Sequence, residues 1–263
     1  MRLNPLADPA QAARQLRETA GRGAPGGSLT ILRDEHLINA YLAWAHDLER
    51  LIRNYFVEPD LDGLYSTRYW QIRAQGPTAP RLYETVIQEA TWQFDRLTAV
   101  ADDLGERVER LAGDPTATFA VLDTNVFLHC RPLSDFEWGF VAAGSVRVIV
   151  PLRVIEELDA RRRDRNAEIC DRARAGIRLL RDHLTDLSGP RGHLNEHATI
   201  EAFVPAGRRD EVVSADTEIL ETAQELQQFT QRPTLIVTAD YGMQLRAAAS
   251  GLLVSEVPPD YQL

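Results

Sequence analysis

The stretch FAVLDTNVFLHC, residues 119–130, decides how the second half of the chain folds. An apolar, β-rich run reaches Asp123, passes Thr124 and Asn125, and turns apolar again. Such a run predicts a buried strand. Burying an ionised carboxylate costs several kcal/mol unless a cation or hydrogen-bond donors meet it. We therefore expect Asp123 to have a partner that compensates its charge.

Four further apolar runs follow this stretch and alternate with helical patterns. The runs are VRVIVP (146–151), ATIEAFVP (198–205), TLIVTAD (234–240) and LLVSEV (252–257). The helical patterns cover residues 151–184, 214–229 and 241–251. Continuous β-rich runs separated by helices indicate a parallel sheet that is covered on both faces. We predict an α/β, Rossmann-like domain over residues 116–263.

The first half of the chain has a different texture. Residues 1–28 end in the cluster GRGAPGGS and are predicted to be a mobile leader. Residues 29–115 carry apolar side chains at three- and four-residue steps, which predicts an all-α domain. Its two long helices are expected to fold back on each other, and Gly113, Asp114 and Pro115 are expected to stop the second.

Composition excludes some classes of protein. The hydrophobic fraction of 44% and the charged fraction of 26% are typical of globular proteins. No apolar run approaches the roughly 20 residues of a membrane helix, and the N-terminus lacks the apolar core of a signal peptide. Cys130 and Cys170 suit a reducing compartment, so we expect a cytoplasmic protein. The net charge of −10 argues against a general polyanion binder, although a local patch can still bind nucleic acid.

Acidic residues gather where the predicted strands end. Asp123 and Asp240 end strands, Asp216 opens a helix, and Glu157 lies in the first turns of the helix after residues 146–151. Ligands of an open parallel sheet bind at the carboxyl ends of its strands. Carboxylates gathered there repel one another unless a cation neutralises them. Oxygen ligands without a nearby Cys/His set favour Mg²⁺ or Mn²⁺.

The ordered set DTN, VIEEL, SADTEIL and VTAD resembles the PIN-domain family of metal-dependent ribonucleases. The resemblance covers roughly residues 118–258 and leaves the first half without a family. It places Asp123, Glu157, Asp216 and Asp240 on the acidic positions of the family. Asn125 matches its orienting amide, and Thr238 matches the Ser/Thr that precedes the last acid. The arginine-rich helix and the insertion with HLNEH depart from the family pattern and bear on the choice of substrate.

The resemblance implies a mechanism. The acids would hold one or two Mg²⁺ or Mn²⁺ ions, which lower the pKa of a bound water and stabilise charge on the scissile phosphate. Asp123 and Asp240 are the expected principal ligands; Asp216 completes the set, and Glu157 binds a second ion or positions water. Asn125 and Thr238 orient the carboxylates by hydrogen bonds. The expected reaction is hydrolysis of phosphodiester bonds in single-stranded RNA.

Each acid also has a simpler explanation. Asp216 and Asp240 lie where helices start, so either could cap a helix. Glu157 could pair with Arg161, one helical turn later. Asp123 suits neither role, because it lies inside an apolar run.

The basic cluster Arg161, Arg162, Arg163 and Arg165 admits two interpretations. It could guide the RNA backbone toward the acids, or it could be a solvated face paired with Glu157, Asp159 and Glu168.

Other motifs weigh less. The pentad His193–His197 matches H-x-x-E-H of a zinc-peptidase group, but that chemistry needs a helix, and this pentad precedes a strand-like run. Asp123 with Asn125 is similar to the D-x-D of haloacid dehalogenases, but an amide cannot donate the proton that family needs. Trp44, Trp70 and Trp92 could stack on bases, although we favour the core for them.

Three functions remain open. The first is a Mg²⁺/Mn²⁺-dependent endoribonuclease. The second is a catalytically silent PIN-like scaffold that binds RNA or protein, with the helical half mediating contact with a protein partner or a second copy of the chain. The third is a structure-specific DNA nuclease.

Overall fold

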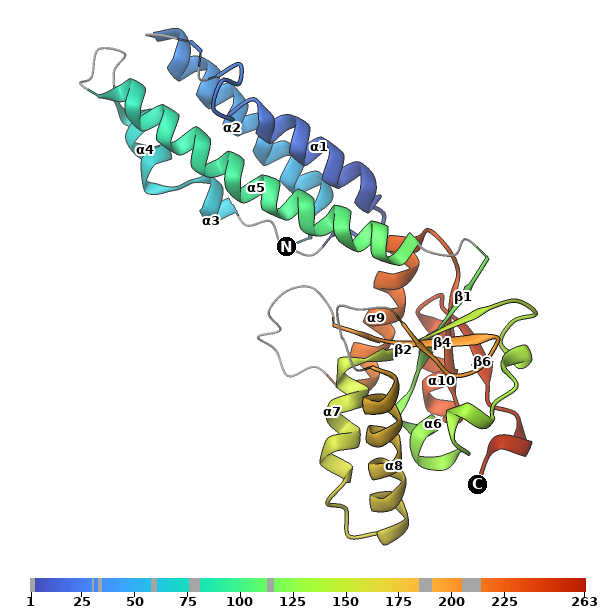
Figure 1. Ribbon diagram of the computed structural model, residues 1–263. Helices are drawn as coiled ribbons and strands as arrows, with labels where there is room; N and C mark the ends of the chain where they lie inside the picture. The colour runs from blue at the N-terminus through green and yellow to red at the C-terminus, as the bar shows by residue number, and fades with distance from the viewer. Residues whose placement is uncertain are drawn as a thin grey trace. The chain divides into compact units, whose positions relative to one another are not determined.

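The computed structural model describes residues 3–29, 31–32, 35–57, 61–75, 81–112, 116–184, 191–204 and 214–263. The chain divides into two compact units, Met1–Ala112 and Gly113–Leu263, so the division lies close to the predicted boundary near residue 115 (Figure 1). The expected stop at Gly113, Asp114 and Pro115 lies outside the described residues. No helix in the described ranges combines the length and apolar character needed to cross a membrane.

The first unit is helical throughout its described part. Its elements are α1 (Pro9–Gly21), α2 (Glu35–Tyr55), α3 (Leu61–Leu64), α4 (Thr67–Ala74) and α5 (Leu82–Ala112). The predicted long helices correspond to α2 and α5, which contact each other.

The mobile leader predicted over residues 1–28 is wrong, because α1 lies within it. The Asp8 carboxylate caps this helix by accepting from the backbone N–H groups of Ala10 and Gln11. Leu16 and Ala20, four residues apart, are fully buried, and α1 packs along α5 and α2. An N-terminal cap and an apolar helix face outweigh the Gly/Pro cluster that follows.

The tryptophans of this unit divide between core and surface. Trp44 is fully buried and donates from Nε1 to the carbonyl oxygen of Thr19 at 2.7 Å. The core position favoured for Trp70 and Trp92 is wrong, since their exposed fractions are 52% and 41%. The guanidinium groups of Arg73 and Arg96 lie over their rings.

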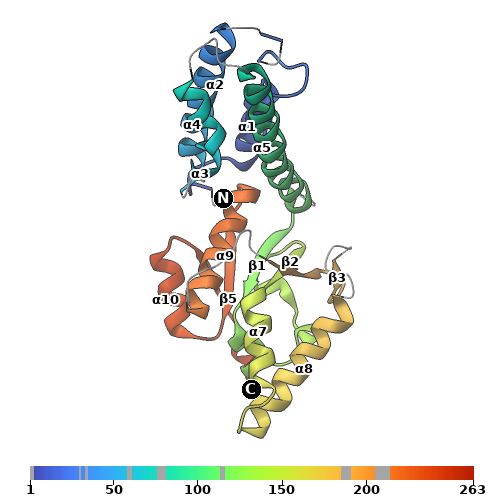
Figure 2. The ribbon, with the colours of Figure 1, turned by 90° about the vertical axis from the view of Figure 1, so that its left-hand side faces the viewer.

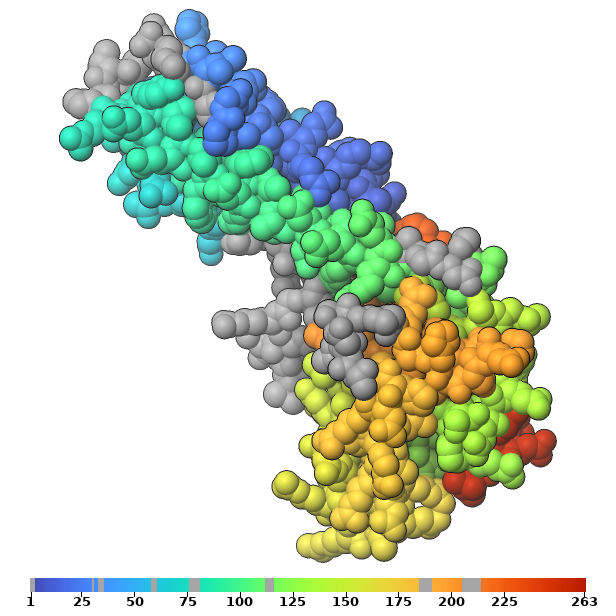
Figure 3. All heavy atoms as spheres, in the orientation of Figure 1, coloured from blue at the N-terminus to red at the C-terminus, as the bar shows by residue number. Residues whose placement is uncertain are grey.

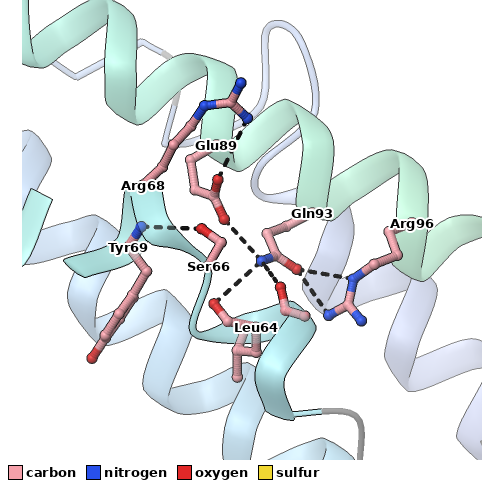
Figure 4. A network of polar contacts seen from close by, with 8 residues as sticks. Leu64, Ser66, Arg68, Tyr69, Glu89, Gln93 and Arg96 are labelled. Atoms are coloured by element: carbon pink, nitrogen blue, oxygen red, sulfur yellow. Dashed lines mark hydrogen bonds and ion pairs between the residues drawn. The ribbon is translucent and has the colours of Figure 1, made fainter. Parts of the chain in front are cut away.

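A buried amide ties α3 to α5 (Figure 4). Gln93 Nε2 lies 2.8 Å from the carbonyl oxygen of Gly63, 3.3 Å from that of Leu64 and 2.9 Å from Glu89 Oε1. Glu89 and Gln93 are both fully buried. Arg96 donates to Gln93 Oε1, so the amide serves as both donor and acceptor.

We expect Gln93→Leu to destabilise the protein by roughly 1–3 kcal/mol, because buried acceptors lose their donor. Urea denaturation measures the change. Gln88→Leu, the same substitution at an exposed position of α5, is the matched control and should change stability little. An equal effect of the two substitutions would contradict a specific role for the buried amide.

The second unit is built on a six-stranded sheet of order β3-β4-β2-β1-β5-β6. The strands are β1 (Thr118–Leu122), β2 (Val146–Pro151), β3 (Gly192–His193), β4 (Ala198–Phe203), β5 (Thr234–Thr238) and β6 (Leu253–Glu256). The helices are α6 (Thr124–His129), α7 (Leu152–Arg161), α8 (Ala167–His183), α9 (Ala215–Thr230) and α10 (Tyr241–Ala249), with 3₁₀ turns η1 (Leu133–Asp135), η2 (Trp138–Phe140) and η3 (Pro259–Tyr261). All pairings are parallel except β3 with β4. The predicted α/β class and parallel sheet are confirmed.

The strand order fixes where a ligand can bind. Strand β1 lies at the centre, with β2 on one side and β5 on the other, so the chain changes direction at β1. Figure 2 shows α9 and α10 beside β5, whereas α7 and α8 lie toward β2 and β3, and α7 and α9 are in contact. The carboxyl ends of β1, β2 and β5 therefore meet at the switch point of the sheet.

The long arginine-rich helix predicted over residues 151–184 is wrong, because it is two helices. Helix α7 ends at Arg161, and Asn166 starts α8 by accepting from the N–H of Glu168 at 3.0 Å. Asp164 supports the turn by accepting from the N–H of Asn166. Asp and Asn form such local bonds and interrupt helices without Gly or Pro. Figure 3 shows this segment, in yellow, at the surface of the second unit.

Candidate active site

Asp123 connects β1 to α6 and is almost fully buried, with an exposed fraction of 3%. Its N–H donates to the carbonyl oxygen of Val237 and so extends the β1–β5 pairing. Its carboxylate makes no capping bond to α6. Instead, Oδ2 accepts from Thr238 Oγ1 at 2.7 Å and from Asn125 Nδ2 at 3.2 Å. The Asp123 carboxylate is therefore bonded to Thr238 and Asn125, the two residues predicted from the sequence to orient it.

The surroundings of Asp123 disfavour its charged form more than water would. Burial raises the pKa of this carboxyl above its ordinary value, and the hydrogen bonds from Thr238 and Asn125 act in the opposite direction. The Asp216 carboxylate raises the pKa further. The donors thus compensate only part of the penalty of burial, which leaves a carboxylate that a cation would stabilise.

Thr238 and Asp240 follow one another at the carboxyl end of β5. The fully buried Thr238 hydroxyl donates to Asp123 and accepts from the N–H of Asp240 at 2.9 Å, so it joins two of the acids. Asp240 Oδ1 accepts from the N–H of Gly242 at 2.7 Å. Asp240 therefore caps α10, which is the helix-cap role considered for it in the sequence analysis.

Asp216 is not a helix cap. Ser214 caps α9 by accepting from the N–H of Thr217, and Asp216 lies at the second helical position. Its carboxylate pairs instead with Arg246 of α10, with 2.6 Å between Asp216 Oδ2 and Arg246 Nη2. Both side chains are partly exposed, at 40% and 49%.

Glu157 of α7 accepts a hydrogen bond from Thr124 Oγ1 at 2.6 Å. The alternative partner, Arg161, pairs with Asp164 instead. Thr124 is a residue that sequence reasoning missed, although it is the middle letter of DTN. It is buried next to Asp123 and links that residue to the helix that carries Glu157.

The four acids are gathered at one sheet edge but do not surround one point. Thr238 joins Asp123 to Asp240, Thr124 brings Glu157 to the DTN segment, and Asp216 acts electrostatically on Asp123. Within the described ranges, which include all four acids, the His, Cys, Asp and Glu side chains form no group of three or more that could hold a metal ion. The oxygen donors fit Mg²⁺ or Mn²⁺ in type, and the side chains would have to converge to bind one.

A family model described as a PIN domain matches residues 120–257, a little over half of the chain. The chain belongs to the PIN-domain family. The match runs from within β1 to just past β6 and includes all four acids, and it confirms the resemblance inferred from DTN and its followers. PIN domains are typically nucleases, generally metal-dependent ribonucleases.

Among solved structures, the PIN domain is similar to a domain of a functionally unknown protein from Methanocaldococcus jannaschii DSM 2661. The sequences are 19% identical, the match covers 54% of this chain and 91% of that chain, and the TM-score is 0.38. No curated protein matches the chain at a significant level.

The arginine cluster of the PIN domain lies at the end of α7 away from the sheet edge. Arg161 pairs with Asp164 at 2.9 Å and Arg162 with Asp159 at 2.6 Å. Arg163 and Arg165 are exposed. Two of the four arginines thus have acidic partners in their own segment. Asp159 is one of the three acids predicted to pair with this cluster if it is a solvated face.

The HLNEH pentad forms a strand end and a turn rather than a helix. His193 belongs to β3, and Asn195 Oδ1 accepts from the N–H groups of His197 and Ala198. The two histidines therefore lack the one-turn helical spacing of a zinc peptidase.

We expect Asp123→Asn to leave the metal-free protein as stable as wild type, or more stable, at neutral pH. Because the folded-state pKa of Asp123 is raised, its contribution to stability is present below the ordinary aspartate pKa of 3.8 and is lost as pH rises through the raised value. The melting temperature of D123N relative to wild type should therefore rise as pH increases above about 4. Thermal melts over a pH series in chelator test this. A much lower melting temperature at neutral pH would instead show that the fold needs the charge.

Thr238→Val removes the shorter hydrogen bond to Asp123. We expect the metal-free protein to lose about 1–3 kcal/mol at neutral pH, since a buried carboxylate loses a donor. Urea denaturation measures the loss. In the D123N background the loss should be smaller, because no charge remains to be compensated. An equal loss in both backgrounds would assign the role of Thr238 to its bond with the N–H of Asp240.

Proposed function

We propose that this PIN domain is a Mg²⁺/Mn²⁺-dependent endoribonuclease that hydrolyses phosphodiester bonds of single-stranded RNA. The observation that carries the proposal is Asp123, a buried carboxylate at the switch point whose pKa is raised by burial and by the charge of Asp216. A divalent cation would relieve both effects. Family membership supports a nuclease-type reaction.

In this proposal Asp123, Asp216, Asp240 and Glu157 hold the metal. Thr238 and Asn125 orient the Asp123 carboxylate, and Thr124 orients Glu157, all through hydrogen bonds already present. A bound ion supplies the activation of water and the stabilisation of charge on the scissile phosphate. The chain's own contribution is to orient Asp123 and Glu157, whereas the four acids as a set would still have to converge on the ion.

The RNA backbone is proposed to approach along α7, where Arg161, Arg162, Arg163 and Arg165 form a basic segment. The pairs of Arg161 and Arg162 with acids are exposed, so phosphate can compete for them at little cost. We assign contact with a protein partner or a second copy of the chain to the helical unit, where Trp70 and Trp92 are about half exposed. The buried free Cys130 and Cys170 accord with a cytoplasmic location.

The silent scaffold is the second candidate function. It is favoured by one observation: in the described residues the acids form no group that could hold a metal ion. A scaffold of this kind would bind RNA or protein without binding Mn²⁺ at these acids.

Cleavage of single-stranded RNA with Mn²⁺ tests the nuclease proposal. We expect D123N to lose more than about 100-fold in rate, because even partners one shell outside a metal ligand contribute 10–100-fold. Asp171→Asn is the matched control, since Asp171 lies on α8 in an exposed pair with Arg174, and it should cleave like wild type.

Equal cleavage by wild type and D123N would reject the assignment. Competition with single-stranded and structured DNA separates the ribonuclease from the DNA nuclease. No cleavage together with no binding of Mn²⁺ would favour the scaffold.

A further inference from the structure

The sheet edge that carries the four acids also carries a positively charged side chain, that of Arg246. Arg246 Nη2 lies 2.6 Å from Asp216 Oδ2. Gly242 lies between Arg246 and Asp240. A Cβ atom built on this glycine would lie 3.2 Å from Asp240 Oδ1 and 3.4 Å and 3.7 Å from Nη2 and Nη1 of Arg246, so the two side chains flank the same position. The guanidinium is therefore bonded to one predicted metal ligand and lies in the same small volume as a second.

Arg246 suits the role of a counter-ion for these acids. An arginine side chain stays charged at all physiological pH values. Asp216 acts on Asp123 electrostatically, so a positive charge bonded to Asp216 offsets the field that the buried carboxylate feels. The pairing also joins the first turn of α9, which carries Asp216, to the last turn of α10, the helix that Asp240 caps.

The same pairing opposes metal binding. A carboxylate oxygen that accepts from a guanidinium at 2.6 Å must exchange this partner before it can bind an ion. A guanidinium next to Asp240 also repels a divalent cation. The pair is half exposed, and exposed pairs are weak, so Arg246 can leave Asp216 without disturbing the core.

We propose that Arg246 is a built-in counter-cation that competes with the divalent metal for Asp216 and so sets the affinity of the site. The inference rests on the proposed function, because it requires that the acids bind a metal.

Calorimetric titration of the metal-free full-length protein with Mn²⁺ tests this inference. We expect Arg246→Gln to tighten Mn²⁺ binding by about 5-fold, the factor that matches the upper range for an exposed ion pair. Arg246→Lys keeps the charge and should bind Mn²⁺ close to wild type. Arg174→Gln removes a similarly exposed charge on α8 and should leave the affinity unchanged.

A second measurement uses metal-free melting temperatures. R246Q should lower the melting temperature in the wild-type background and should have a smaller effect in the D216N background, because the carboxylate bonded to Arg246 is then absent. The rise in melting temperature on adding Mn²⁺ should be larger for R246Q than for wild type.

The outcomes separate the two proposals. If wild type binds Mn²⁺ and R246Q binds it equally or more weakly, competition by Arg246 is overturned while the nuclease proposal stands. If R174Q tightens binding as much as R246Q, net charge explains the effect and the inference also fails. If neither wild type nor R246Q binds Mn²⁺, the proposed metal site itself is wrong.

Discussion

The structure of the PIN domain is organised around the electrostatic penalty of placing a carboxylate at the end of a buried central strand. Asp123 occupies that position because β1 lies between β2 and β5, and the carboxyl ends of these two strands precede Glu157 and Asp240. A chain that brings several carboxylates to one edge must compensate each of them. The side chains around the edge are best understood as that compensation.

Each acid has a different kind of partner. Asp123 has two side-chain donors, Asp240 has a backbone N–H, Glu157 has a threonine hydroxyl, and Asp216 has an arginine. Neutral donors orient a carboxylate without removing its charge, whereas an arginine neutralises it. Arg246 is therefore the partner whose exchange for a metal changes the charge balance of the edge the most.

The ion pair between Arg147 of β2 and Glu201 of β4 shows how a permanently paired arginine is placed. Arg147 of β2 has an exposed fraction of 1%, donates to Glu201 at 2.7 Å and lies over the ring of Phe119 at 4.4 Å. Loss of Glu201 would leave the Arg147 guanidinium buried without a carboxylate partner. The pair of Arg246 and Asp216 is half exposed, so water can take over either partner. The two pairs have the same chemistry, but only the exposed one can be exchanged.

Sequence patterns located the strands and the acids because both are local properties. Apolar runs marked β1, β2, β4, β5 and β6, and the acids followed from the positions where those runs end. Features without a strong apolar or Gly/Pro pattern were missed. The apolar face of α1 was obscured by the Gly/Pro cluster after it, and the break between α7 and α8 depends on Asp164 and Asn166 rather than on Gly or Pro. Arg246 has no motif of its own; it matters only because α10 sets it against α9. The resemblance to the family therefore predicts which acids would hold a metal under the proposed function, while the contacts of this chain show how those acids are paired in its absence.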